Sequence, residues 1–157
     1  MMEPSYARDL AIWNRLVQSH EAFAFASVEF LTGPVDRVTV LRGALRGHGK
    51  HTAIWMLRSL RQSELQELFD DLVFQASYAH GEIKAVRDVI WSLPREWVIS
   101  NIESVAEPLL ADGTYDEYRR LLELFALLDP LLTKRLAERA AQHSDPDIQE
   151  VGHDFLI

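Results

Sequence analysis

A break in the helical pattern recurs every 32 residues, and this spacing constrains the fold more than any other feature of the chain. Gly and Asp suit such breaks because a helix end commonly needs a left-handed residue or a new N-cap. A unit of two helices repeated at this length is typical of stacked helical repeats. We therefore predict an all-α fold, an α-solenoid of stacked antiparallel helix pairs with about nine to ten helices. The four breaks are His48-Gly49, His80-Gly81, Asp112-Gly113 and Ser144-Asp145.

Apolar residues between the breaks follow helical spacing. After each break they stand three or four positions apart, over 53–60, 83–93, 118–128 and 148–155. A second helix of the same kind follows each of the first three stretches. Leu60, Leu93 and Leu128 close the first helices at spacings of 33 and 35 residues. Pro94 and Pro130 suit the first turn of the helices that follow, where a missing N–H costs nothing.

Residues 34–157 resemble the HEAT repeat family. The turn Ser144-Asp145-Pro146-Asp147-Ile148 looks like the family's Asp/Pro-rich turn with its aliphatic residue. Ile83-Lys84 and Tyr118-Arg119 look like its aliphatic–basic pairs, whereas Gln149 replaces the basic residue in the last unit and Lys50-His51 departs from the pair in the first. The resemblance implies a helical array with an extended surface suited to a partner protein.

The first 33 residues are predicted to form a pair of helices that caps the array, so that residues 1–157 make a single domain. The first helix places Tyr6, Leu10 and Trp13 on one face, which puts Trp13 in the core. The second spans about 20–31 and is apolar nearly all round, as helices are that lie buried or in an interface. Thr32-Gly33-Pro34 ends this pair, and a helix over 35–46 follows.

The motif search favours a non-enzymatic protein. The chain has no cysteine, which excludes disulfides, thiolate zinc sites and cysteine nucleophiles. It also lacks a phosphate-binding glycine loop, a His-Glu-x-x-His pair and a Gly-x-Ser-x-Gly elbow. One His-Glu dyad, His20-Glu21, is too few for the ligand set of HEAT-like iron hydroxylases. We predict no catalytic residue, no metal site and no cofactor.

Targeting signals are also missing from the sequence. No basic region followed by an apolar one opens the chain, and no apolar run approaches the roughly 20 residues of a membrane helix. Together with the missing cysteines, this pattern favours a cytoplasmic protein with no membrane partner.

Charge is distributed unevenly around a net value of −8. Residues 33–61 carry six basic side chains against Asp36 alone, a net charge of +5, whereas residues 101–157 carry five basic and twelve acidic side chains, a net charge of −7. The basic band over 37–61, with Trp55, could bind nucleic acid as HEAT-like DNA glycosylases do. The overall negative charge counts against this alternative, and the band could equally be a solvated helix face.

Binding of another protein is the function that these features favour. The chain would act as a scaffold, an adaptor or an inhibitor-type interaction protein, and nucleic-acid binding or DNA repair is the alternative. Trp55 and Trp91 fall off the apolar stripes of their helices, and exposed Trp is common among binding hot spots, although Trp91 could instead pack against the next repeat. The candidate partner-binding residues are Trp55, Trp91, Arg42, Arg46, Lys50, Arg58, Lys84, Arg119 and Glu123.

The last residues, Phe155-Leu156-Ile157, continue an apolar pattern. The ends of a solenoid normally need a polar outer face. We therefore expect that a partner or a second copy covers this end, which allows a homodimer.

Overall fold

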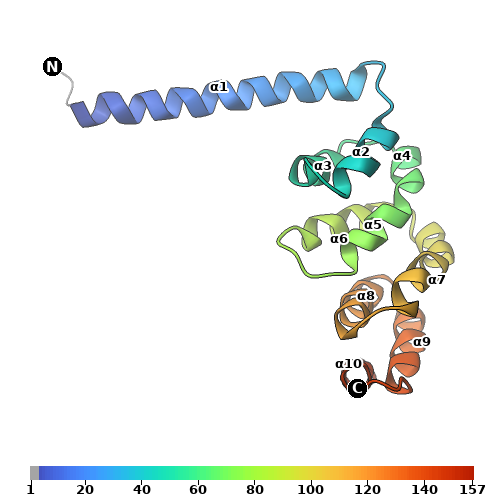
Figure 1. Cartoon of the computed structure of the whole chain (residues 1–157). Coiled ribbons are helices and arrows are strands. Elements are labelled where there is room, and N and C mark those ends of the chain that lie inside the picture. The colour runs from blue at the N-terminus through green and yellow to red at the C-terminus, as the bar shows by residue number, and fades with distance from the viewer. Residues whose placement is uncertain (1–3) are drawn as a thin grey trace. The chain divides into compact units, whose positions relative to one another are not determined.

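The computed structural model describes residues 4–157, which form ten helices and no β-strand (Figure 1). The all-α prediction is confirmed. The chain divides into two units, Met1–Arg37 and Val38–Ile157, and each is described by itself. The helices are α1 Pro4–Thr32, α2 Arg37–Leu45, α3 Lys50–Leu57, α4 Gln62–Glu67, α5 Phe69–Ala76, α6 Ile83–Ser92, α7 Arg95–Ala111, α8 Tyr115–Leu128, α9 Pro130–Ala141 and α10 Pro146–Asp154.

The N-terminal unit is a single helix of 29 residues, α1, where the sequence analysis predicted two helices. The predicted break near residue 20 is wrong because nothing between Tyr6 and Thr32 ends a helix: the segment holds no Gly and no Pro. The Trp13 side chain is 59% exposed, so its predicted place in a core is also wrong. Whether α1 caps the array stays a prediction.

Every predicted break lies between two helices of the second unit. His48-Gly49 separates α2 from α3, and His80-Gly81 separates α5 from α6. The other two breaks separate α7 from α8 and α9 from α10. Gly49 has φ 85°, a left-handed conformation that glycine adopts without the steric cost of a Cβ.

Side chains at the later breaks cap the helices that follow. The hydroxyl of Thr114 accepts a hydrogen bond from the backbone N–H of Asp116, and Glu117 completes a capping box at the start of α8. The Asp129 carboxylate accepts from the N–H groups of Leu131 and Leu132 at the start of α9. The Asp145 carboxylate does the same for α10. These caps satisfy backbone donors that a helix start leaves unpaired.

The predicted second helix of the first repeat is bent into α4 and α5 at Leu68. Arg42 Nη2 donates to the backbone carbonyl oxygen of Glu67, 2.6 Å away, next to this bend. A side chain that enters the hydrogen-bond ladder of a helix is a known cause of a kink. The total of ten helices therefore agrees with the prediction although the helices are divided differently.

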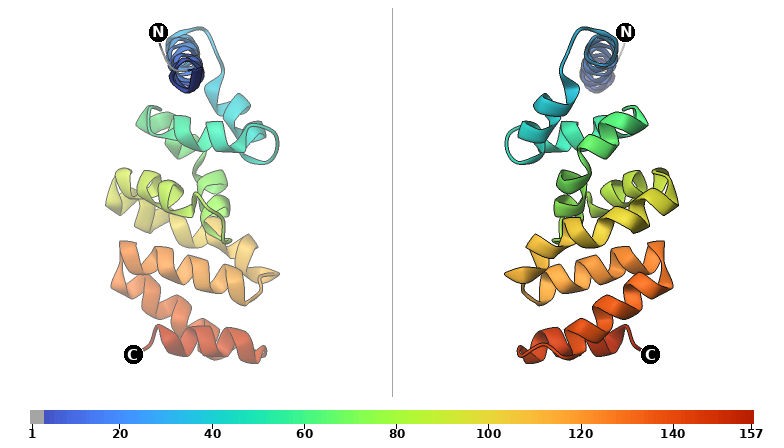
Figure 2. Two further views of the ribbon diagram at one scale, coloured as in Figure 1. Left: turned by 90° about the vertical axis from the view of Figure 1, so that its left-hand side faces the viewer. Right: turned by 90° about the vertical axis from the view of Figure 1, so that its right-hand side faces the viewer.

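The second unit buries its apolar stripes between helices that are close in sequence and between helices one repeat apart. Helices α3 and α6, α5 and α7, and α8 and α10 are in contact, besides neighbours such as α8 and α9 (Figure 2). The largest fully buried side chains are Tyr118, Phe125, Leu45, Leu57, Leu68, Leu72, Ile90, Ile102, Leu121, Leu122, Leu124 and Leu128.

The end of this unit differs from the expectation. Ile148 and Val151 of α10 are buried, whereas Asp147, Glu150 and Asp154 are exposed. Helix α10 thus has a polar outer face. This face was not predicted, because the apolar residues at the end of the chain were expected to continue across it. Only Leu156 and Ile157 extend the exposed apolar surface there.

Close packing of α10 on α9 depends on Gly152. A Cβ at this position would lie 2.3 Å from the backbone nitrogen of Ala141 and 2.7 Å from the carbonyl oxygen of Ala137. Both are main-chain atoms, so they cannot move aside as a flexible side chain can. The helix axes must therefore separate if residue 152 carries a side chain.

We expect Gly152→Ala to lower the free energy of unfolding by about 1–3 kcal/mol, the usual cost of overpacking. Urea unfolding followed by circular dichroism measures this change. Gly43→Ala is the matched control: Gly43 lies in α2 with open space around its Cβ position. This change should raise stability by about 0.5–1 kcal/mol, and equal losses in both variants would contradict the packing argument.

Candidate functional site

Two tryptophans are exposed on neighbouring helices of the second unit. The side chain of Trp55 on α3 is 54% exposed and that of Trp91 on α6 is 56% exposed. Both positions fall off the apolar stripes of their helices, and for Trp91 the sequence left open whether the side chain is exposed or packs against the next repeat. Leu60 and Leu93 are equivalent positions in the sequence pattern. Arg58 and Trp91 each precede one of them by two residues, so these two positions are equivalent as well. Indole rings and charges thus share one face of the packed helices α3 and α6.

An arginine lies over each of the two indole rings. The guanidinium carbon of Arg58 is 4.3 Å from the ring centroid of Trp55, and that of Arg95 is 5.8 Å from the ring centroid of Trp91. Such cation–π contacts restrict both side chains without burying them. The rings are therefore held in place while much of their surface remains accessible.

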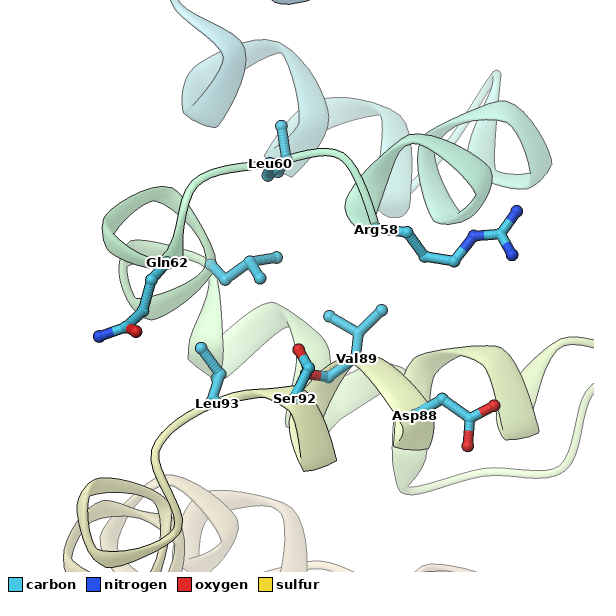
Figure 3. Close-up of a pocket in the computed structure, with 8 residues that line it drawn as sticks. Arg58, Leu60, Gln62, Asp88, Val89, Ser92 and Leu93 are labelled. Carbon is cyan, nitrogen blue, oxygen red and sulfur yellow. The ribbon is translucent and has the colours of Figure 1, made fainter.

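A groove of about 380 Å³ lies between the α3–α4 connection and α6 (Figure 3). Its apolar lining comes from Leu60, Leu65, Val89 and Leu93. Arg58 and Asp88 extend to one side of the groove and Gln62 lies at the other (Figure 3). An apolar lining with a few polar groups around it is typical of a binding groove for an apolar side chain.

The charges beside this groove are free to rearrange. Lys84 Nζ donates to Asp88 Oδ2 at 2.8 Å within α6, but the two side chains are 86% and 63% exposed. An exposed ion pair of this kind contributes little to stability. Lys84, predicted as a binding residue, therefore lies beside the groove and can exchange its partner.

The basic band is held by a buried carboxylate. Arg42 Nε and Arg46 Nε each donate to a different oxygen of Asp71 at 2.9 Å, and Asp71 is 1% exposed. This hydrogen bond raises the pKa of Arg42. Both arginines therefore tie α2 to α5, and a buried carboxylate needs such partners because an unpaired buried charge is costly.

The other cations of the band have partners as well. Lys50 donates to the hydroxyl of Tyr78 and lies 4.7 Å from the centroid of its ring. Arg61 forms an ion pair with Glu64 at 3.7 Å, and His51 Nδ1 lies 2.7 Å from Glu82 Oε1. The basic residues of the band are thus clustered in the sequence, but most of them have an acidic or polar partner in the structure.

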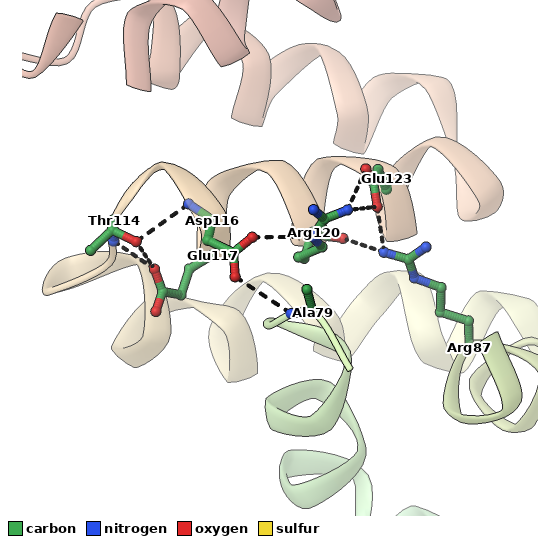
Figure 4. Close-up of polar contacts among 7 residues, drawn as sticks. All are labelled: Ala79, Arg87, Thr114, Asp116, Glu117, Arg120 and Glu123. Atoms are coloured by element: carbon green, nitrogen blue, oxygen red, sulfur yellow. Dashed lines mark hydrogen bonds and ion pairs between the residues drawn. The ribbon is translucent and has the colours of Figure 1, made fainter. Parts of the chain in front are cut away.

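Acidic and basic side chains form a second network between α6 and α8 (Figure 4). Arg87 Nη2 on α6 donates to Glu123 Oε2 at 2.7 Å and to the backbone oxygen of Arg120 at 3.3 Å. Arg120 also forms hydrogen bonds with Glu123 and Asp116. Burial alone would raise the pKa of Glu123, but Arg87 and Arg120 together lower it. Glu123, predicted as a binding residue, thus joins two helices.

Arg119 has a comparable role between α8 and α10. Its Nη2 donates to Asp154 Oδ2 at 2.7 Å, which joins α8 to α10. Arg135 and Arg139 of α9 form ion pairs with Glu103 and Glu107 of α7, in each case across 32 residues of sequence. The acidic C-terminal half is therefore partly neutralised by contacts between successive repeats.

Asp71, which accepts hydrogen bonds from Arg42 and Arg46, was not among the residues predicted from the sequence. A signal was present, because Asp71 lies three residues after Leu68 and Gln75 lies seven after it, which puts both on the buried face of their helix. Gln75 is also buried, and its Nε2 donates to the backbone oxygen of Leu45 at 2.8 Å. Polar residues at buried helical positions indicate internal hydrogen bonds.

No protein-family model, no curated protein and no solved structure matches this chain. Within residues 4–157, no group of three or more His, Cys, Asp or Glu side chains could hold a metal ion. No helix in the described part of the chain is both long and apolar enough to cross a membrane. The site is therefore characterised by its own residues alone.

Replacing both arginines of the band should destabilise the fold. Arg42→Ala with Arg46→Ala leaves the Asp71 carboxylate buried without partners, at a cost of about 3–5 kcal/mol in the free energy of unfolding. Chemical denaturation of the double variant measures this cost, with Arg58→Ala as the control at an exposed arginine. Adding Asp71→Asn should restore part of the stability, and an unchanged unfolding midpoint in the double variant would refute the structural role.

Acid should weaken ion pairs between helices and the cap at the start of α8. The pKa values of Glu107, Glu117 and Glu123 are lowered from the usual 4.5, so their contribution to stability is complete above that pH and is lost as the pH falls through the lowered values. Glu123→Gln should cost about 1.5–3 kcal/mol at neutral pH and make the acid-induced loss shallower. Urea titrations between neutral and acid pH test this, with Glu138→Gln, at an exposed pair within α9, expected to change little.

Proposed function

We propose that this chain is a HEAT-like α-solenoid that acts as a non-enzymatic scaffold and binds a partner protein. The contact surface would be the face of α3 and α6 that carries Trp55, Trp91 and the apolar groove. The observation that carries the proposal is the apolar groove beside α6 together with two exposed, arginine-held indole rings on α3 and α6.

The arrangement of helices supports a stacked array. Contacts recur between helices one repeat apart, and ion pairs join residues 32 positions apart on α7 and α9. The four breaks at 32-residue spacing all separate helices. Stacked helix pairs of this kind present an extended surface for a partner.

The chemistry of the face supports a protein as the partner. Trp is enriched among residues that dominate binding energy, and such residues cluster where water can be excluded. An amphipathic segment of the partner would insert an apolar side chain against Leu60, Leu65 and Val89 and cover the two indole rings. The exposed charges of Arg58 and Asp88 would then meet polar groups of that segment.

Nucleic-acid binding receives less support from the same residues. Phosphate binding needs cations that are free to neutralise the backbone of the nucleic acid. Arg42 and Arg46 share Asp71, and Lys50 is held by Tyr78. The accessible face of α3 and α6 carries the exposed cations Arg58 and Lys84, but also the acidic Asp88 and two indole rings.

A pull-down from an extract of the source cells tests the proposal. We expect the full chain to retain a protein that resists nuclease treatment and moderate salt. Trp55→Ala with Trp91→Ala should weaken binding of the purified protein by on the order of 100-fold or more, as loss of two hot spots would. Isothermal titration calorimetry measures that change.

Tyr115→Ala is the matched control for this experiment. Tyr115 is an aromatic residue that is 53% exposed, and it lies on α8 and not on α3 or α6. Its replacement should leave affinity unchanged. Equal binding by the wild-type chain and the double tryptophan variant would overturn the proposed surface, and capture of nucleic acid alone would overturn the proposed partner.

A further inference from the structure

Helix α1 carries an apolar face that no other part of its own unit covers. The helix has 29 residues, which corresponds to a length of about 43 Å. Apolar residues at spacings of three, four and seven fall along one side over its whole length. The large members that are exposed on this face are Tyr6, Leu10, Ile12, Trp13, Leu16, Phe23 and Val28.

Among the charged residues of α1, Asp9 lies on this face and the other four lie at its edge or away from it, and the charges divide by sign along the helix. Residues 4–18 carry Arg8, Arg15 and Asp9, a net charge of +1, and residues 19–32 carry Glu21 and Glu29, a net charge of −2. A helix of this kind is complementary to itself in the antiparallel direction, because each positive half then lies along a negative half. Antiparallel packing also aligns the helix dipoles favourably.

We propose that α1 binds α1 of a second copy of this chain as an antiparallel pair through its apolar face, with the two-fold axis at the level of residue 18 along the helix. The inference concerns α1 alone and does not depend on the groove of the second unit. Two-fold symmetric dimers, in which the same patch meets itself, are the commonest form of protein oligomer.

Two aromatic pairs agree with this register. Around residue 18, Trp13 lies level with Phe23 of the second copy, and Tyr6 lies level with Phe30. Leu16 lies level with His20 and Val28 with Arg8, so these two apolar residues meet side chains with a polar or charged end. The aliphatic part of an arginine side chain can cover apolar surface while its guanidinium group stays in water.

The available area also fits a dimer. Seven large apolar side chains, each about half exposed, offer on the order of 700 Å² per copy. A standard interface buries roughly 800 Å² per partner. Most of the stability of helices in proteins comes from packing of an amphipathic face, and pairing would supply such packing for α1.

The first test is the mass of the full chain in sedimentation equilibrium over a dilution series. We expect a species of twice the 18.0 kDa chain mass that dissociates on dilution. Trp13→Glu or Phe23→Glu should raise the dimer dissociation constant by on the order of 100-fold or more, because a symmetric dimer loses each anchor twice. The main thermal transition of the second unit should stay unchanged in both variants.

Phe25→Glu is the matched control. Phe25 is 76% exposed but lies on the side of α1 that carries Gln18, Glu21 and Glu29. The dimer should survive this change. A monomeric wild-type chain would overturn the proposal, as would equal disruption by Phe25→Glu and Trp13→Glu.

Spin labels distinguish the antiparallel pair from other arrangements, since the chain has no cysteine of its own. A label at Ser5→Cys should give a distance between copies of about 40 Å, because residue 5 lies far from the axis. A label at Ser19→Cys should give a short distance, close to the roughly 8–10 Å between packed helix axes plus the label arms. A short distance at both sites would indicate a parallel pair and overturn the proposal.

Discussion

The apolar stripes of the second unit can be buried only if each helix contacts two neighbours, and the rest of that unit depends on this constraint. Helix α8 shows it best, because it buries residues from Tyr118 to Leu128 on more than one side. Helices α7, α9 and α10 all contact it. The helices of this unit have 6 to 17 residues and depend on packing for most of their stability, so removing one layer exposes the stripe of the next.

Apolar burial is non-directional, so it does not by itself fix how far one helix slides along another. The arginine–carboxylate contacts fix this position, because each one requires two particular side chains to meet. Asp71 holds α2 against α5, Glu123 holds α6 against α8, and Glu107 holds α7 against α9. These contacts pair several of the chain's arginines with its own carboxylates, whereas Lys84 and Arg58 stay exposed.

Local chemistry explains what the sequence could predict. Helix ends at Gly49, Asp129 and Asp145 follow from residues at the break itself, and the outward positions of Trp55 and Trp91 follow from helical spacing. The bend at Leu68 could not be found this way, because it involves Arg42, a residue 25 positions from the carbonyl group it contacts. The ion pairs of Asp71 likewise join it to Arg46 and Arg42, which are 25 and 29 positions away in the sequence. Contacts of that range depend on the packing of whole helices.

Helix α1 also has an apolar face, but this face is not buried within its own unit. Two short helices in its place, as the sequence pattern first indicated, could have folded back and buried their apolar faces against each other. A continuous helix cannot do so, because its face points in one direction over its full length. The absence of Gly and Pro between Tyr6 and Thr32 therefore has a consequence beyond local structure. It leaves Trp13 and Phe23 without cover inside their unit, so that whatever stabilises this helix must come from outside it.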